Sequence, residues 1–301
     1  MRITNNMLVN NMVYNLNQNL KGLEKLQFQQ ATGKKFRVPS DDPIGASKSL
    51  KFNTDISKLE QYERNAKDAH SWMVDTEAAL GEIVAVLHRA NELTVDAANG
   101  TKTTEDLHKI KEEIDQLKEH LVQIANTTYA GRHIFSGYKT DKPLLNEDGT
   151  YNNEVFPFGD NEVFEYNVGV SERIKVNTLG DKVFGDAADD VPHLIKVFED
   201  LSTALESNIP DDIQTALGNL ENSLEQTLSV RSEVGAKMNR LELTQKKLGV
   251  QIDSVKELLS YNEDVDLAEI SMHIAMAENV YISSLMTGAK IIQPTLVEFL
   301  R

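Results

Sequence analysis

The chain has 301 residues, of which 40% are hydrophobic and 26% charged, a composition typical of a folded protein of two or three domains. Its net charge of −16 repels nucleic-acid phosphates, and the absence of cysteine excludes disulfides and thiolate metal sites. The first residues lack the apolar stretch of a signal peptide, and no apolar run has the length that a bilayer requires. We therefore expect no membrane insertion and no nucleic-acid partner, and a chain that either stays in the cytoplasm or leaves by a route without a cleaved leader.

Both ends of the chain carry apolar residues at spacings of three and four, the pattern of amphipathic helices. Such faces need partners, and the simplest partners are each other and the same segments of neighbouring subunits. Charge supports the pairing of the ends, because residues 1–40 hold six basic side chains and one acidic one, whereas residues 262–301 hold six acidic and two basic ones. The predicted assembly interface comprises Val9, Met12, Val13, Leu16, Leu20, Leu23, Leu267, Ile270, Ile274, Ala277, Tyr281, Leu285, Ile292, Leu296 and Phe299.

The pattern after the first linker predicts one long helix from about residue 43 to about residue 98. Asp42 followed by Pro43 is typical of a helix start, and Asn99-Gly100 of a helix end. Apolar and small residues alternate spacings of three and four between them, as in a coiled coil. Its predicted seam is Leu59, Tyr62, Ala66, Ala69, Met73, Thr76, Leu80, Ile83, Leu87, Ala90, Thr94 and Ala97.

Two further helices are expected to pack on this one. One begins after Thr103, whose Thr-x-x-Asp pattern with Asp106 resembles a capping box, and it should fold back antiparallel. The other begins at Pro210-Asp211 and carries a heptad seam that Arg231 and Gln245 interrupt. We interpret these two polar residues as a solvated seam edge, with a role in fixing register as the alternative.

Residues 132–185 change character, with more glycine and aromatic residues, a turn at Asp148-Gly149 and alternating apolar residues that include Tyr166, Val168 and Val170. This pattern predicts a small β-rich insertion on the outer surface, with no part in the axial packing of the helices, followed by a shorter helix at about 191–207. The fold class predicted is mainly α: a long coiled-coil-like helical rod with the terminal helices paired at one end and the insertion at the other. The expected domains are 1–42, an assembly helix and linker; 43–131, a helical hairpin; 132–190, the insertion; 191–261, the return helices; and 262–301, the C-terminal assembly helix.

Signals for catalysis are poor. Glu105-x-x-His108 has the spacing used in di-iron bundles, but no second such pair exists, so a solvated helix surface is expected. The glycine-bounded residues 131–137 lack the Gly-Lys-Ser/Thr ending of a phosphate loop. The basic residues Lys34, Lys35 and Arg37 indicate a solvated face, with a subunit contact as the alternative. We expect no enzyme activity, no cofactor, no metal site and no catalytic residue.

Several stretches are similar to signatures of the bacterial flagellin family. Residues 30–35 (QATGKK) and 37–46 (RVPSDDPIGA) resemble its N-terminal signature, and residues 91–101 (NELTVDAANGT) resemble a second family stretch. Within the family, three segments resemble the hook–filament junction branch more than filament flagellin. These are residues 1–7 (MRITNNM), 131–141 (GRHIFSGYKTD) and 291–300 (IIQPTLVEFL).

The resemblance implies a secreted structural subunit of the flagellum, exported through the flagellar type III apparatus after a cytoplasmic chaperone has held its C-terminal helix. It implies self-association in a ring that adapts the first hook-associated protein to flagellin. Filament flagellin is the leading alternative, because it would share the architecture. A cytoplasmic coiled-coil scaffold explains the heptads but not the pairing of the ends, and a di-iron enzyme is the weakest reading.

Overall fold

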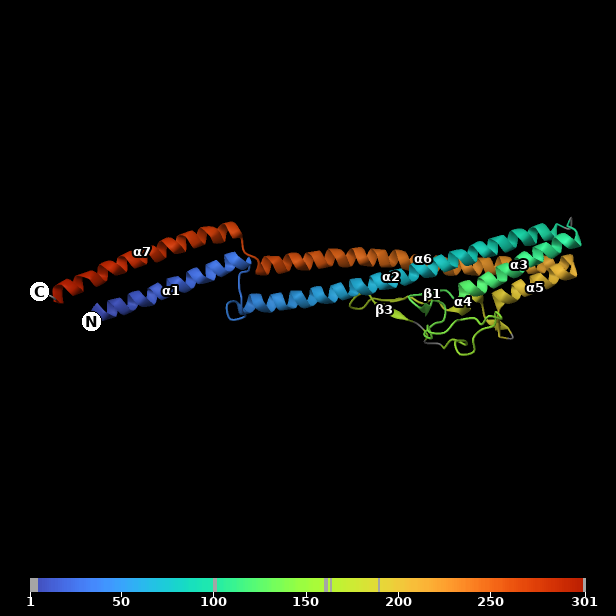
Figure 1. Cartoon of the computed structure of the whole chain (residues 1–301), viewed down its shortest axis with the longest axis horizontal. Helices are drawn as coiled ribbons and strands as arrows, with labels where there is room; N and C mark the ends of the chain where they lie inside the picture. Colours follow the sequence, from blue (N-terminus) through green and yellow to red (C-terminus); the bar gives the residue numbers. More distant parts are fainter. Residues whose placement is uncertain (1–4, 100–101, 160–161, 163, 189, 300–301) are drawn as a thin grey trace. The chain divides into compact units, whose positions relative to one another are not determined.

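The computed structural model describes residues 5–99, 102–159, 162, 164–188 and 190–299, and it describes no side chains at 5–6, 187–188 and 291–299. The described part is mainly helical, with short strands between the helices (Figure 1). The helices are α1 (Asn5–Thr32), α2 (Pro43–Ala98), α3 (Thr104–Ala125), α4 (Gly180–Phe184), α5 (His193–Ser207), α6 (Pro210–Glu263) and α7 (Leu267–Phe299). The strands are β1 (Thr128–Tyr129), β2 (Arg132–His133), β3 (Glu165–Asn167), β4 (Arg173–Lys175), β5 (Ala187–Ala188) and β6 (Val191–Pro192).

The chain forms two compact units. Unit 1 consists of Met1–Lys58 and Gln251–Arg301, and unit 2 is Leu59–Val250. Unit 1 therefore contains α1, α7, the first turns of α2, the last turns of α6 and the two linkers between these helices. Among the helices of the described part, none is long and apolar enough to cross a membrane.

The ends of α2 and α3 are set by the residues that the sequence singled out. The Asp42 carboxylate accepts hydrogen bonds from the backbone N–H groups of Ile44 (3.1 Å) and Gly45 (2.9 Å), so it caps the first turn of α2. Thr103 accepts from the N–H of Asp106 at 3.3 Å and caps α3 in the same way. The predicted bounds of α2 are confirmed. From Ala66 to Ala97 its predicted seam is buried throughout, and Leu59 and Tyr62 are partly buried against the same core.

The two polar residues in the α6 seam make specific contacts with α2. Arg231 donates to the Glu77 carboxylate from Nε (2.9 Å) and Nη2 (2.6 Å), and Gln245 donates to the backbone oxygen of Ala66 at 3.1 Å. The interpretation of these positions as a solvated edge is therefore wrong. Each side chain binds its own position on the facing helix, Glu77 for Arg231 and Ala66 for Gln245, which is what a residue that fixes register does.

In the described residues between α3 and α5 there are three two-stranded antiparallel sheets, in which β1 pairs with β2, β3 with β4 and β5 with β6. Tyr166 faces Ile174 across β3 and β4, but the strand ends at Asn167, and Val170 lies in the following turn with 89% of its surface exposed. The alternation that predicted a longer strand is broken there by Gly169.

This segment shares the main hydrophobic core of unit 2. Phe135, Leu144, Tyr151 and Phe184 are almost fully buried, and they belong to one cluster with residues of α2, α3, α5 and α6. The expectation that the insertion takes no part in the axial packing of the helices is wrong. The alternating pattern was read as one buried face of a separate small sheet, whereas its apolar residues pack against the helices themselves.

Candidate assembly interface

Helices α1 and α7 of unit 1 form an antiparallel pair, which we call the terminal pair. Figure 1 shows them side by side, with both chain ends at the same end of the pair. Cross-helix contacts fix the direction, because Asn19 Nδ2 donates to Ser284 Oγ at 3.2 Å and Gln30 Nε2 donates to Ser271 Oγ at 3.5 Å. The pairing of the two terminal helices was predicted, and the structure confirms it.

Among the side chains that the structure describes, full burial of apolar residues within the terminal pair is confined to one short stretch. Leu23, Ile270 and Ile274 are buried together, and Leu26, Val265 and Ala277 pack against them. Leu26 and Val265 were missed by the sequence analysis; Leu26 has the helical spacing from Leu23 that would have placed it on the same face. A pair of helices of this length usually buries an apolar stripe along its whole length. In the terminal pair, many of the described apolar side chains outside this stretch are instead open to solvent.

The predicted interface residues fall into four groups. Three of them, Leu23, Ile270 and Ile274, are buried within the pair. Val9, Met12, Leu16, Ala277 and Tyr281 are half-buried, and Val13, Leu20, Leu267 and Leu285 are exposed. The side chains of Ile292, Leu296 and Phe299 lie outside the described residues. The structure thus brings both stripes onto one helix pair and leaves much of their apolar surface open to solvent.

More exposed apolar residues lie on α7 than the stripe predicted. Met272, Met276 and Val280 follow one another at spacings of four and are 53–60% exposed, and Ile282 and Met286 are also exposed. A groove between the two helices is lined by apolar residues that include Leu8, Met12 and Val280, together with asparagine and serine side chains. A helix that is apolar on more than one face is typical of a helix surrounded by several others.

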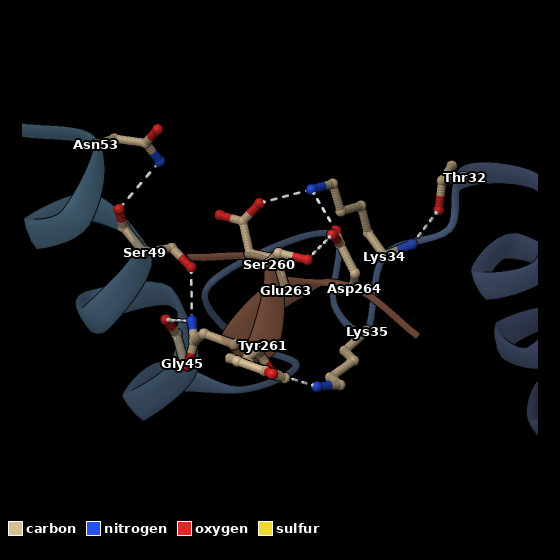
Figure 2. Close-up of polar contacts among 11 residues, drawn as sticks. Thr32, Lys34, Lys35, Gly45, Ser49, Asn53, Ser260, Tyr261, Glu263 and Asp264 are labelled. Atoms are coloured by element: carbon tan, nitrogen blue, oxygen red, sulfur yellow. Dashed lines mark hydrogen bonds and ion pairs between the residues drawn. The ribbon is translucent and has the colours of Figure 1, made fainter. Parts of the chain in front are cut away.

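The two linkers of unit 1 are joined by a group of polar residues, Lys34, Lys35, Asn262, Glu263 and Asp264, which we call the linker clasp (Figure 2). Lys34 Nζ lies 2.9 Å from Glu263 Oε2 and 2.7 Å from Asp264 Oδ1. Lys35 Nζ donates to the backbone oxygen of Tyr261 at 2.5 Å. The backbones pair as well, since Lys35 N donates to the oxygen of Glu263 at 2.6 Å and Val265 N to that of Gly33 at 3.0 Å.

The linker clasp also holds the start of α2. Asn262 Nδ2 donates to the backbone oxygen of Gly45 at 2.8 Å and to Ser49 Oγ at 2.7 Å. Gly45 is buried, and a Cβ there would come within 2.9 Å of a carbon atom of the Phe36 ring. This position therefore has no room for a side chain while the linker packs as it does.

The linker clasp changes the titration of its charged groups. The hydrogen bonds that Lys34 donates to Asp264 and Glu263 raise the pKa of its ammonium group. The hydrogen bond from Lys34, with a second from Ser260, lowers the pKa of the Asp264 carboxyl. Both ions are stabilised in their charged forms, although the side chains of Lys34 and Asp264 are each 44% exposed, so solvent screens part of the attraction.

The interpretation of the basic residues 34, 35 and 37 as a solvated face is incomplete for the two lysines, and the alternative of a subunit contact stays a prediction. Both lysines bind the segment that precedes α7 in their own chain, whereas Arg37 is exposed, with its guanidinium carbon 5.9 Å from the centre of the Phe28 ring. The sequence offered one signal for this contact, the opposite charge of the two ends.

Comparison with known proteins identifies the family. The model of the bacterial flagellin N-terminal helical region matches residues 3–140, and that of the bacterial flagellin C-terminal helical region matches residues 217–300. The flagellar hook-associated protein 3 of Escherichia coli K12 is 30% identical over 254 residues, which cover 75% of this chain and 78% of that protein. The flagellin of Bacillus subtilis 168 is also 30% identical, over 277 residues that cover 89% of each.

Solved structures of the same kind share the fold. The crystal structure of Bacillus cereus FlgL aligns with a TM-score of 0.59 at 27% identity and covers 70% of this chain and 99% of that one. The flagellar hook-associated protein 3 of Legionella pneumophila aligns with a TM-score of 0.60 at 18% identity, covering 70% of this chain and 97% of that one. The terminal pair and the linker clasp fall within or beside the regions that the two family models match. The chain belongs to the bacterial flagellin family.

Proposed function

We propose that this chain is the subunit that joins the hook-associated ring of the bacterial flagellum to its flagellin filament. The observation that carries the proposal is the terminal pair, in which the described apolar side chains are fully buried in one short stretch and many others are exposed. Names of relatives support the choice of role, because the proteins similar to this chain include hook-associated protein 3.

The proposed assembly is a ring in which the terminal pairs of neighbouring subunits cover one another. The exposed apolar residues on more than one face of α7 supply adhesion to several neighbours at once. Polar groups in the groove between α1 and α7 limit the registers in which a neighbouring helix fits, because each unmatched polar group that is buried there would cost free energy. The interface residues are those predicted from the sequence, extended by Met272, Met276 and Val280.

The first hook-associated protein would be the partner on one side of the ring and flagellin the partner on the other. Before assembly the chain would pass through the flagellar export apparatus, with a cytoplasmic chaperone holding its C-terminal helix. A chaperone on α7 would cover apolar surface, since this helix exposes several large apolar side chains in the isolated subunit.

The proposed role is structural and not catalytic. Among the described residues, no group of three or more His, Asp and Glu side chains is placed to hold a metal ion. Glu105 and His108 lie on the exposed surface of α3, where His108 is 3.8 Å from Glu112 and 68% exposed. The function proposed needs only surfaces that bind other subunits.

The test is to delete the gene and to locate the protein. We expect cells without the gene to build hooks and to release flagellin into the medium. In the parent strain, an antibody against the protein should label the base of each filament, and it should also label hooks from which the filaments have been sheared. Filaments of normal length in the deletion strain would refute the junction role.

The second candidate is filament flagellin, which the 30% identity to the B. subtilis flagellin over 89% of the chain favours. The purified protein distinguishes the two. Polymerisation of the pure chain into long filaments, and antibody labelling along the whole filament, would support flagellin over the junction subunit.

A further inference from the structure

Three methionines of α7 are exposed on one face of that helix. Met272, Met276 and Met286 are 56%, 60% and 65% exposed. Met276 follows Met272 by about one helical turn and Met286 follows it by about four turns, so the three side chains point to the same side of α7. They form part of the exposed apolar surface that neighbouring subunits cover in the proposed ring.

The other methionines whose side chains the structure describes differ from these three in place or in exposure. Met73 is 1% exposed in the core of unit 2, and Met238 packs against the same core. Met12 is half-buried in the terminal pair, where a Cβ added at Gly288 would lie 2.6 Å from its sulfur. Met7, on α1, is 53% exposed. An oxidant in solution therefore reaches the α7 methionines and Met7 before the others.

The thioether is the only sulfur group of this chain, because the sequence contains eight methionines and no cysteine. A peroxide oxidises a thioether to a sulfoxide by oxygen transfer. The sulfur lone pair attacks one peroxide oxygen, the O–O bond breaks as the S–O bond forms, and the other oxygen leaves with the transferred proton as water. The sulfur thus loses two electrons, which reduce the peroxide. Two thiols reverse the step by supplying two electrons and two protons, and the products are the thioether, a disulfide and water.

Oxidation at these positions changes the surface that a neighbour has to cover. A methionine side chain is flexible and apolar, and it adapts to the shape of a partner. Its sulfoxide is polar and chiral, and a polar group costs free energy when a neighbour buries it without a hydrogen bond. We propose that Met272, Met276 and Met286 are a site of reversible oxidation, at which a peroxide converts the free subunit to a form that cannot assemble and a methionine sulfoxide reductase restores it. The proposal rests on the proposed function, since the sulfoxides matter only where another subunit covers α7.

The first measurement is the rate of oxidation of each methionine. The full-length subunit is treated with hydrogen peroxide, digested at intervals and analysed by mass spectrometry. We expect Met272, Met276 and Met286 to gain oxygen on the order of ten times faster than Met73, because oxidation follows exposure.

The second measurement is the binding of the purified subunit to hooks isolated from cells that lack the gene. Peroxide treatment that oxidises the three α7 methionines but not Met73 should weaken this binding roughly tenfold or more. Reduction with methionine sulfoxide reductases for both sulfoxide epimers, together with a dithiol, should restore it. The triple substitution Met272→Leu, Met276→Leu and Met286→Leu keeps the volume and removes the sulfur, so this variant should bind hooks with and without peroxide treatment. Met7→Leu is the matched control, since it removes a similarly exposed sulfur outside α7, and its binding should stay sensitive to peroxide.

Four results would each overturn the proposal: equal oxidation rates at Met272 and Met73, undiminished binding of the oxidised parent, no recovery after reduction, or loss of binding by the oxidised triple variant. Insensitivity of the Met7→Leu variant to peroxide would place the site on α1 and overturn its assignment to α7. Failure of the untreated parent to bind hooks would refute the junction role, and the effect on assembly with it, whereas the oxidation rates would still show whether the α7 methionines are the reactive sulfurs.

Discussion

Replacing Leu285 with aspartate should abolish assembly while leaving the isolated subunit folded. Leu285 lies on α7 and is 44% exposed, so a little more than half of its side chain is already covered in the folded subunit, and the substitution should lower the free energy of unfolding by roughly 1–2 kcal/mol. In the proposed ring the same side chain is covered by a neighbour. Full burial of a leucine side chain contributes about 1.5–3 kcal/mol. Covering the exposed part of Leu285 on assembly would therefore contribute about 1 kcal/mol.

The introduced carboxylate weakens assembly further, because a charge covered by apolar side chains costs several kcal/mol unless it is neutralised. A combined loss of about 4 kcal/mol per contact lowers an association constant by roughly a thousandfold. We expect the variant to be exported and to melt by circular dichroism only roughly 2–8 °C below the parent, but to be missing from isolated hooks.

The matched control is Leu243→Asp, since Leu243 is 67% exposed on α6 in unit 2, outside the terminal pair. It should melt at the parental temperature and be incorporated. Normal incorporation of the Leu285 variant, with filaments as numerous as in the parent strain, would refute the proposed interface.

Three other perturbations probe the linker clasp and the core of unit 2. Lys34→Glu should weaken the linker clasp by about 1 kcal/mol, as expected for a partly exposed ion pair, and adding Asp264→Lys should restore at least half of that loss. Hydrogen exchange of the Val265 amide, which donates to the Gly33 oxygen, measures both effects. No rescue by the second substitution would contradict the pairing of Lys34 with Asp264. The same amide should lose protection at both extremes of pH. Because the pKa of Asp264 is lowered, its contribution to stability is present above about pH 4 and is lost as the pH falls through the folded-state pKa. Because the pKa of Lys34 is raised, its contribution is present below about pH 10 and is lost as the pH rises through the folded-state pKa. Protection of the Val265 amide that stays constant at both extremes would exclude this role. Phe135→Ala should destabilise unit 2 by about 3–5 kcal/mol and lower its melting temperature by roughly 6–20 °C, and a fall below about 2 °C would show that residues 132–185 fold apart from the helices.

Local rules were enough to place the long helices. Asp42 and Thr103 accept the hydrogen bonds that their positions predict, because capping depends only on residues a few positions apart. The α2 seam was readable because its spacing of three and four residues follows from helix geometry.

Contacts between distant segments were beyond the sequence. Nothing in the heptad pattern of α6 tells which group on α2 faces Arg231. Its binding to Glu77, 154 positions earlier in the chain, depends on how the two helices are aligned. The contacts of Lys34 were not predicted for the same reason, since its partners lie far along the chain. The packing of residues 132–185 on the helices was missed because the alternation at Tyr166 and Val168 shows that one face is covered but not what covers it.

The predicted interface was only partly accessible to sequence reasoning. Leu23 and Ile274 lie together as the stripes implied, yet Met272 and Met276 were left out because they fall outside a single stripe. A stripe analysis assumes one covered face, and α7 is apolar on more than one. The interface itself stays a prediction until the assembled protein is examined.

The linker clasp also imposes an order in time. Its ion pairs join Lys34 to residues 229 and 230 positions further along the chain, so this contact cannot form until nearly all of the polypeptide has been made or has emerged from a channel. Closing so long a loop costs more entropy than any local contact in α1, and the stabilising contacts form only when the C-terminal segment arrives. Until then α1 has no α7 beside it. A chain that enters a growing structure from its N-terminus would thus form its terminal pair last. The subunit can bind its neighbours through this pair only after α7 has arrived.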